Sequence, residues 1–264
     1  MLSGVAALAL VAVGGVVGYA VRLPEDDLAV VEPGDLEIAD RATGRWTAGT
    51  LEVTLSADGL AVREQGRTLW ENPLDRAFLS AARGSFAVEE HRGHFWPTVD
   101  HTATWTDQRV ARVEVGDDEV RLSGTLVGDR GELAWTATVA PRPGGGAELS
   151  AEVPGADALA LSSGRSPGAG VHGFGEQFTD FDLDDRLLPI IVREQGIGRG
   201  KQPLSLVADL TDISAAGDET TTYAAVASWV TDDLRGVALA SDDPASHAFA
   251  VADTRDDERV TLEI

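Results

Sequence analysis

The chain has 264 residues, of which 43% are hydrophobic, enough for a buried core. Its 44 acidic against 21 basic residues give a formal net charge of −23, which repels phosphate backbones and argues against a nucleic-acid partner. Because the chain has no cysteine, disulfides, thiol catalysis and thiolate metal sites are excluded.

The first segment, residues 1–22, is apolar and carries no charged side chain before Arg22. As a helix it is long enough to cross a hydrocarbon core of about 30 Å. Gly18 and Ala20 also provide the small residues of a signal-peptidase site. No basic residue precedes the run, so the orientation of an anchor stays open. We expect an N-terminal apolar helix that acts as a signal peptide or membrane anchor, and an extracytoplasmic protein, anchored or secreted.

Residues 23–35 are rich in proline and acidic side chains and are expected to form a linker. From residue 49 onward apolar residues alternate with polar ones, as in Leu51, Val53 and Leu55. Turn signals such as Asp58-Gly59 and Gln65-Gly66 separate runs of this kind every 8–12 residues or so. The pattern predicts an all-β fold, an antiparallel β-sandwich, as one domain over residues 36–264.

Three histidines, His91, His94 and His101, lie close together in the sequence. Side chains three apart on a strand point to opposite faces, and a zinc site needs more ligands of defined type. We therefore expect an exposed histidine-rich hairpin here and predict neither a metal site nor a cofactor.

Residues 172–202 read HGFGEQFTDFDLDDRLLPIIVREQGIGRGKQ and crowd polar side chains between glycines. Glycine permits tight loops and close backbone approach. Sugar hydroxyls need donors and acceptors at fixed angles, and a sulfonate or phosphate needs Arg or Lys. After this stretch we expect a strand at 204–207, an acidic loop at 209–219 and a strand at 221–230. The candidate binding residues are Glu176, Gln177, Arg193, Glu194, Gln195, Arg199 and Lys201.

Four motifs in this stretch, GFGEQF (173–178), FDL (181–183), LP (188–189) and REQGIGRGKQ (193–202), resemble the N-terminal domain of family 31 glycoside hydrolases. This is the α-glucosidase family, and the resemblance is to its sulfoquinovosidase-like branch. It implies a β-sandwich of the galactose-mutarotase type that packs against a (β/α)8 barrel and sends loops toward the sugar. It also implies that the catalytic aspartates lie in the barrel, so no catalytic residue is expected in this chain.

The part of the chain after Gln202 is far shorter than the about 250 residues of a barrel. The chain alone is therefore not expected to be catalytically competent, and we expect a carbohydrate and a missing barrel domain as its partners. Two alternatives stay open: a stand-alone extracellular carbohydrate-binding module, and a non-functional fragment of an interrupted gene. An aldose epimerase would need an acid and a base such as His172 and Glu176, but the residues around them resemble the glycosidase.

Overall fold

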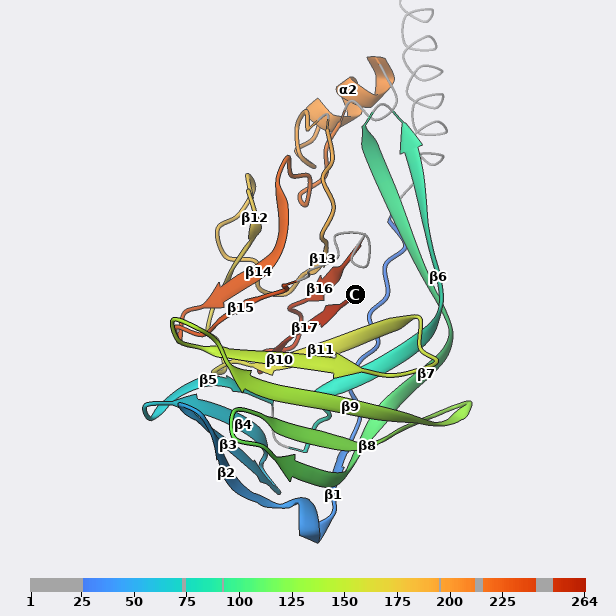
Figure 1. Cartoon of the computed structure of the whole chain (residues 1–264). Helices are drawn as coiled ribbons and strands as arrows, with labels where there is room; N and C mark the ends of the chain where they lie inside the picture. Colours follow the sequence, from blue (N-terminus) through green and yellow to red (C-terminus); the bar gives the residue numbers. More distant parts are fainter. Residues whose placement is uncertain (1–25, 73–74, 92, 195, 212–215, 241–248) are drawn as a thin grey trace, which may run out of the picture.

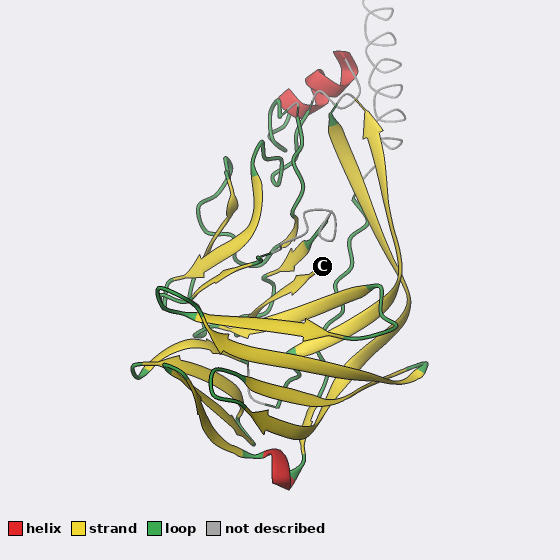
Figure 2. Ribbon diagram, in the orientation of Figure 1, coloured by secondary structure: helices red, strands yellow, loops and turns green. Residues whose placement is uncertain are grey.

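The structure is a computed structural model that describes residues 26–72, 75–91, 93–194, 196–211, 216–240 and 249–264 (Figure 1). The expected signal or anchor, residues 1–22, lies outside this range. The described residues form an all-β fold with antiparallel sheets, as predicted from the alternating pattern (Figure 2). Among the helices of the described ranges, none has the length and apolar character needed to cross a membrane.

A four-stranded sheet forms the base of the molecule, and its strands follow one another as hairpins. Leu51, Val53 and Leu55 are buried on one face, which confirms the alternation expected from the sequence. Gln65 and Gly66 have φ values of 51° and 80°, the two positive values of a type I′ hairpin turn. The strands are β2 (Gly44–Ala48), β3 (Leu51–Ser56), β4 (Gly59–Glu64) and β5 (Arg67–Glu71).

The largest sheet of the described residues has the order β10-β9-β8-β7-β6-β11-β17-β16-β13, with β1 beside β7. Its longest hairpin, β6–β7, extends beyond the sandwich as an arm (Figure 1). The strands are β1 (Leu36–Ile38), β6 (Leu79–His91), β7 (His94–Val115), β8 (Val120–Gly128), β9 (Gly131–Pro141), β10 (Ala147–Glu152), β11 (Ala158–Gly164), β13 (Leu187–Pro189), β16 (Val251–Asp253) and β17 (Arg259–Glu263).

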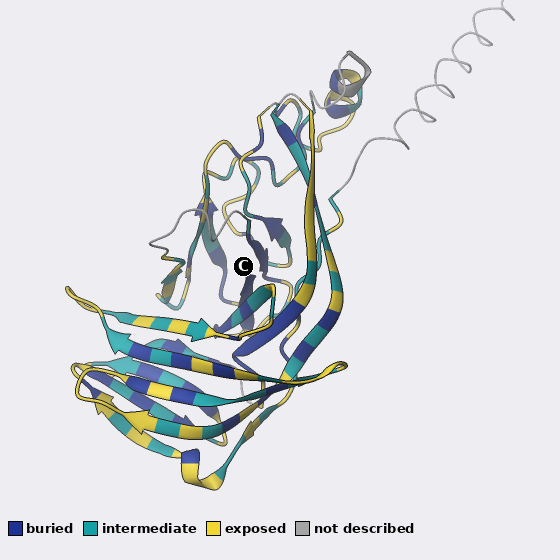
Figure 3. Cartoon of the chain, turned by 45° about the vertical axis from the view of Figure 1, so that its right-hand side comes forward, coloured by how far each residue is buried: buried dark blue, intermediate teal, exposed yellow. Residues whose placement is uncertain are grey.

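A third sheet has the order β12-β14-β15 and consists of β12 (Val171–Gly175), β14 (Ala225–Thr231) and β15 (Gly236–Ala238). Its buried residues Val171, Phe174 and Trp229 pack with residues of β13, β16 and β17. We call this cluster the second core. The first core lies between the four-stranded sheet and strands β6–β9 of the largest sheet, so buried residues alternate along these strands (Figure 3).

Aromatic side chains sit at the centre of the first core. The ring of Phe78 makes edge-to-face contacts with Trp70, at a centroid distance of 5.8 Å, and with Trp135, at 5.6 Å. This geometry places the positive edge of one ring against the negative face of another. The arrangement joins the two sheets of a β-sandwich through one packed aromatic cluster.

The described part of the expected linker, residues 26–35, runs extended across the largest sheet. The backbone of Asp27 donates to the Pro97 carbonyl at 3.1 Å and accepts from the Val99 amide at 2.8 Å. Val31 is buried, and its amide donates to Glu263 Oε2 at 2.7 Å. These contacts attach the segment to the sandwich along its length.

The strand expected at residues 204–207 is wrong, because the structure has a helix there, α2 (Leu204–Thr211). A short apolar run fits both the period of two of a strand and the period of 3.6 of a helix. Here the small residues Ser205 and Ala208, three apart, are buried on the same face, as in a helix. The acidic loop expected at 209–219 therefore begins inside the helix. The strand expected at 221–230 is present as β14 but starts four residues later, at Ala225. A short 3-10 helix, η1 (Asp40–Ala42), precedes β2.

The histidine-rich hairpin is present as β6–β7, but only part of it is exposed. His91 is exposed at the tip, whereas His94 is buried and its ring lies against Trp96 in a tilted arrangement, with a centroid distance of 4.6 Å. The expectation of an exposed hairpin is therefore wrong for His94.

Candidate functional site

The loop that follows β12 is fixed by close contact with the chain before β14. Gly175 has φ of 99°, and a Cβ on it would lie 1.8 Å from the Ala224 carbonyl oxygen, so no other residue fits without a shift of the backbone. The Glu176 amide then donates to that same carbonyl at 2.8 Å. Thr222 Oγ1 donates to the Glu176 carbonyl. The sequence thus places Glu176 and its neighbours beside residues 222–224.

The second predicted loop, residues 193–202, is held on several sides. The Glu194 amide donates to the Gly93 carbonyl at the tip of the β6–β7 arm at 2.8 Å. Ile197 accepts from Gly217 at 3.0 Å, and Gly217 accepts from Gly200 at 2.8 Å. Gly198 allows α2 to approach, since a Cβ there would lie 2.8 Å from the Ser205 nitrogen. The loop therefore meets the arm, α2 and residues 216–222.

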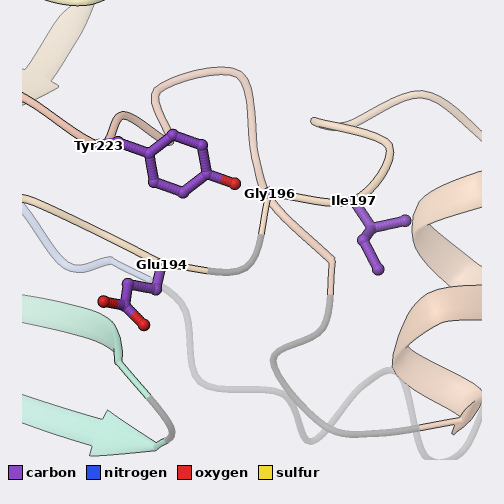
Figure 4. A pocket seen from close by; sticks show the side chains of 4 residues that line it. All are labelled: Glu194, Gly196, Ile197 and Tyr223. Carbon is purple, nitrogen blue, oxygen red and sulfur yellow. The ribbon is translucent and has the colours of Figure 1, made fainter.

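A pocket of about 490 Å³ lies where these segments meet, lined by Glu194, Gly196, Ile197 and Tyr223 (Figure 4). Glu194 provides a carboxylate, and Tyr223 provides a half-exposed ring with a hydroxyl group. Carboxylates accept hydrogen bonds from hydroxyl groups, and an aromatic face packs against apolar surface of a ligand. The pocket therefore combines the polar and apolar groups that a sugar ring requires.

Arg199 connects the two loops at this pocket. Its guanidinium lies over the ring of Phe178 at 4.2 Å and 5.5 Å from the ring of Tyr223. The same group donates through Nη1 to the Gly196 carbonyl at 3.2 Å. Phe178 and Tyr223 also make an edge-to-face contact at 5.6 Å. A planar cation stacked on two rings is oriented as well as charged.

Arg193 has a different position from the one expected. It is fully buried and forms ion pairs with Asp26 and with Asp218, the latter at 2.5 Å. Burial raises the pKa of Asp26 despite the opposing effect of Arg193. Burial would also raise the pKa of Asp218, but Arg193 and hydrogen bonds from Thr220 and Thr221 lower it. In this structure Arg193 holds other segments and does not line the pocket.

The other predicted residues lie around the same loops. Glu176 and Lys201 are exposed, and Gln177 Nε2 donates to the Phe174 carbonyl at 3.3 Å. Gln195 lies outside the described residues. Sequence reasoning missed the aromatic contribution of Phe178 and Tyr223, and nothing in the local sequence around Tyr223 indicates that it meets the earlier glycine-rich loops.

His172 is occupied by contacts within the protein. Its Nε2 lies 2.9 Å from Asp232 Oδ1 and its Nδ1 lies 3.0 Å from the Phe181 carbonyl. The carbonyl contact and the Asp232 contact raise the pKa of His172, which donates from both nitrogens when protonated. Neither nitrogen is left for acid–base work on a sugar. Over the residues that the structure describes, no cluster of three or more His, Asp or Glu side chains is arranged to hold a metal ion.

No protein-family model matches the sequence, and no curated protein matches it. A GH31 family sulfoquinovosidase from E. rectale, solved in complex with an aza-sugar inhibitor, is similar in structure, with a TM-score of 0.65 and 20% sequence identity. The match covers 80% of this chain and 30% of that enzyme's chain. The described fold therefore resembles that of part of this enzyme.

Proposed function

We propose that this chain is the N-terminal β-sandwich domain of a family 31 α-glycosidase and supplies loops to its sugar pocket. The observation that carries the proposal is the pocket that Glu194, Gly196 and Ile197 of the second glycine-rich loop form with Tyr223. The fold likeness to part of a GH31 sulfoquinovosidase supports it. The catalytic carboxylates belong, in this proposal, to a (β/α)8 barrel outside this chain.

The proposed contacts follow from the chemistry of the side chains. Glu194 accepts hydrogen bonds from sugar hydroxyls, and Tyr223 packs against the ring of the sugar. Arg199 is already oriented on Phe178 and supplies a positive charge at the pocket edge. Glu176 and Lys201 are further polar contacts at the rim. The positive charges of Arg199 and Lys201 suit a sulfonated sugar, whereas an uncharged α-glucoside depends more on Glu194.

The test is titration of the purified chain with methyl α-glucoside and with a methyl α-sulfoquinovoside, followed by calorimetry. We expect binding to be weakened at least ~tenfold by Glu194→Gln and by Tyr223→Ala, since each removes a contact made by a pocket-lining group. Glu148→Gln is the matched control, because Glu148 is an exposed residue of the edge strand β10. Equal affinities for Glu194→Gln, Tyr223→Ala and the control would contradict the proposed pocket.

A second arm distinguishes the domain of an enzyme from a stand-alone module. A barrel from a family 31 enzyme, added as a separate chain, is expected to hydrolyse chromogenic α-glycosides faster with this chain than without it. Sugar binding without any effect on the barrel would favour a carbohydrate-binding module. Absence of both would favour a non-functional fragment.

We also propose an extracytoplasmic location, which is supported by the apolar character of residues 1–22. A green fluorescent protein fused to the C-terminus is expected to stay dark when the chain is exported unfolded from a bacterial cytoplasm. Bright cytoplasmic fluorescence would contradict this location.

A further inference from the structure

The buried guanidinium of Arg193 joins three segments that are far apart in the sequence. Its Nη2 donates to Asp26 of the N-terminal segment, and its Nη1 donates to Asp218 at 2.5 Å. The Arg193 side chain has no exposed surface. A buried charge of this kind is tolerated only when carboxylates compensate it. We call Asp26, Arg193 and Asp218 the clasp.

The clasp lies directly behind the two side chains that give the pocket its chemistry. The Arg193 amide donates to the Thr222 carbonyl at 2.9 Å. The next residue after Arg193 is Glu194, and the next after Thr222 is Tyr223, and both line the pocket. One backbone hydrogen bond therefore sets the spacing between Glu194 and Tyr223. The ion pairs of the clasp hold the residues on either side of that bond.

Asp218 is the more strongly fixed of the two carboxylates. Its Oδ1 accepts from the amide and hydroxyl of Thr220, both at 2.8 Å, and from Thr221 Oγ1 at 3.0 Å. Its Oδ2 is then left for Arg193. Asp26, in contrast, contacts Arg193 through Oδ2, and its buried Oδ1 has no hydrogen-bond partner among the described residues. Among the described residues, the Asp26 side chain therefore hydrogen-bonds only to Arg193.

The N-terminal segment is attached to the sandwich independently of Asp26. The backbone of Asp27 pairs with Pro97 and Val99, and Glu32 forms an ion pair with Arg259 at 2.9 Å. The segment is therefore expected to stay in place when the Asp26 carboxylate is removed. Substitution of Asp26 then tests the ion pair itself, and not the attachment of the segment.

We propose that Asp26, Arg193 and Asp218 are positioning residues that hold Glu194 and Tyr223 at a fixed separation, so that the N-terminal segment is part of the binding site. The effect of these residues on sugar binding rests on the proposed function. Their effect on the stability of the two loops does not. Loss of one carboxylate leaves the positive charge of the buried guanidinium only partly balanced. Local opening of residues 193–201 and 216–224, which lets water reach this charge, is the response of lowest free energy.

The experiment is hydrogen–deuterium exchange of the whole chain as wild type, Asp26→Asn and Asp218→Asn. We expect both substitutions to speed exchange in residues 193–201 and 216–224 at least ~tenfold, and to leave β3 unchanged. Asp27→Asn is the matched control, since it makes the same change one residue away on an exposed side chain. Asp26→Glu keeps the charge and is expected to restore most of the protection.

Wild-type exchange in folded Asp26→Asn and Asp218→Asn would overturn the clasp, and so would equal acceleration by Asp27→Asn. If Asp26→Asn does not fold, the exchange of Asp218→Asn still tests the clasp. The exchange rates of Asp26→Glu and Asp27→Asn are then compared with each other as the second measurement. Sugar titration is read separately. Affinity reduced ~tenfold by Asp26→Asn and recovered in Asp26→Glu supports the pocket role. If the wild type binds no sugar, the proposed function fails while exchange still decides the clasp.

Discussion

Arg165 is almost completely buried, and its terminal nitrogens are satisfied within the protein. Nη1 donates to the Ala169 carbonyl at 2.5 Å, while Nη2 donates to the carbonyls of Asp256 and Thr254 and pairs with Asp184. These acceptors belong to separate loops, so the one guanidinium organises the chain where the first part of the sandwich leads to β12. Arg165 and Arg193 are thus both buried arginines that hold separate loops together, each at a different place in the fold.

The change Arg165→Met tests this role. It keeps a long apolar stem but leaves several buried acceptors without a donor, so we expect the free energy of unfolding to fall by about 3 kcal/mol. Arg45→Met is the control, since Arg45 is exposed and its ion pair with Glu52 spans 3.5 Å, and we expect a change of at most about 0.5 kcal/mol. Urea denaturation measures both values. An equal loss in the free energy of unfolding for the two variants would show that the buried hydrogen bonds of Arg165 do not stabilise the fold.

The partly buried His101 pairs with the buried Glu263, with 2.8 Å between His101 Nε2 and Glu263 Oε1. The hydrogen bond that His101 donates to Glu263 raises the pKa of His101, although burial opposes it. A raised pKa in the folded state means that the stabilisation is complete below the ordinary value of about 6.5 and is lost as pH rises through the folded value. The N-terminal segment is affected as well, because Val31 donates to the same carboxylate.

We therefore expect the advantage in unfolding free energy of the wild type over His101→Gln to shrink as the pH is raised from 6 to 9. Urea denaturation at each pH measures the difference between the two proteins. His172 also has a raised pKa and contributes in the same direction, but it is present in both proteins and cancels. A difference that grows with pH would contradict the assigned charge state of His101.

At the scale of elements, the pairing of β12 with β14 depends on glycine for two separable reasons. Gly175 has a positive φ of 99°, and a Cβ on it would lie 1.8 Å from the Ala224 carbonyl oxygen. Gly131, in the turn between β8 and β9, has nearly the same φ of 102° but open space around the Cβ position. The two glycines therefore share the backbone strain and differ in the steric contact.

Alanine at each position separates the two effects. We expect Gly131→Ala to cost about 1 kcal/mol from the strained φ alone. Gly175→Ala is expected to cost at least about 2 kcal/mol more, because the strands must move apart to admit the Cβ. Thermal and urea unfolding give both numbers. A similar loss in the free energy of unfolding for the two substitutions would mean that the backbone at Ala224 moves to admit the Cβ with little loss of stability.

The elements also show which features a sequence can predict. The alternation of Leu51, Val53 and Leu55 predicted β3 correctly, because one face of a strand is buried and the period of two is then unavoidable. The run at 204–207 predicts a strand but belongs to the helix α2, since four residues cannot distinguish a period of two from one of 3.6. Local pattern is therefore sufficient for long strands and insufficient for a short helix.

The sequence predicts those parts of the candidate site that depend on neighbouring residues, and misses those that depend on contacts between distant segments. The second glycine-rich loop is a local feature of the sequence, and the structure places its residues Glu194, Gly196 and Ile197 at one pocket. The burial of Arg193 and the arrival of Tyr223 depend on contacts between segments that are distant in sequence. Such contacts leave no periodic trace in one sequence, so the sequence predicts a pocket-edge contact for Arg193, which the structure shows to be buried in ion pairs.

At the scale of the whole molecule, two cores share one sheet. Strand β11 pairs with β6, which belongs to the first core, and with β17, which belongs to the second. Val237 also packs against both clusters. Because a strand cannot leave one neighbour without disturbing the other, we expect the two cores to unfold together, as in a two-state transition.

Two valines of equal burial test this coupling, Val53 in the first core and Val260 in the second, both with no exposed surface. Each change to Ala removes buried methyl groups and should cost about 2 kcal/mol. In a Trp229→Phe background the tryptophan fluorescence comes from outside the second core. If the cores are coupled, Val260→Ala lowers the urea midpoint of this fluorescence about as much as Val53→Ala does. A midpoint unmoved by Val260→Ala would mean that the second core unfolds by itself, and the loops of the candidate site, which extend from β12 and β14, would then open without the rest of the sandwich.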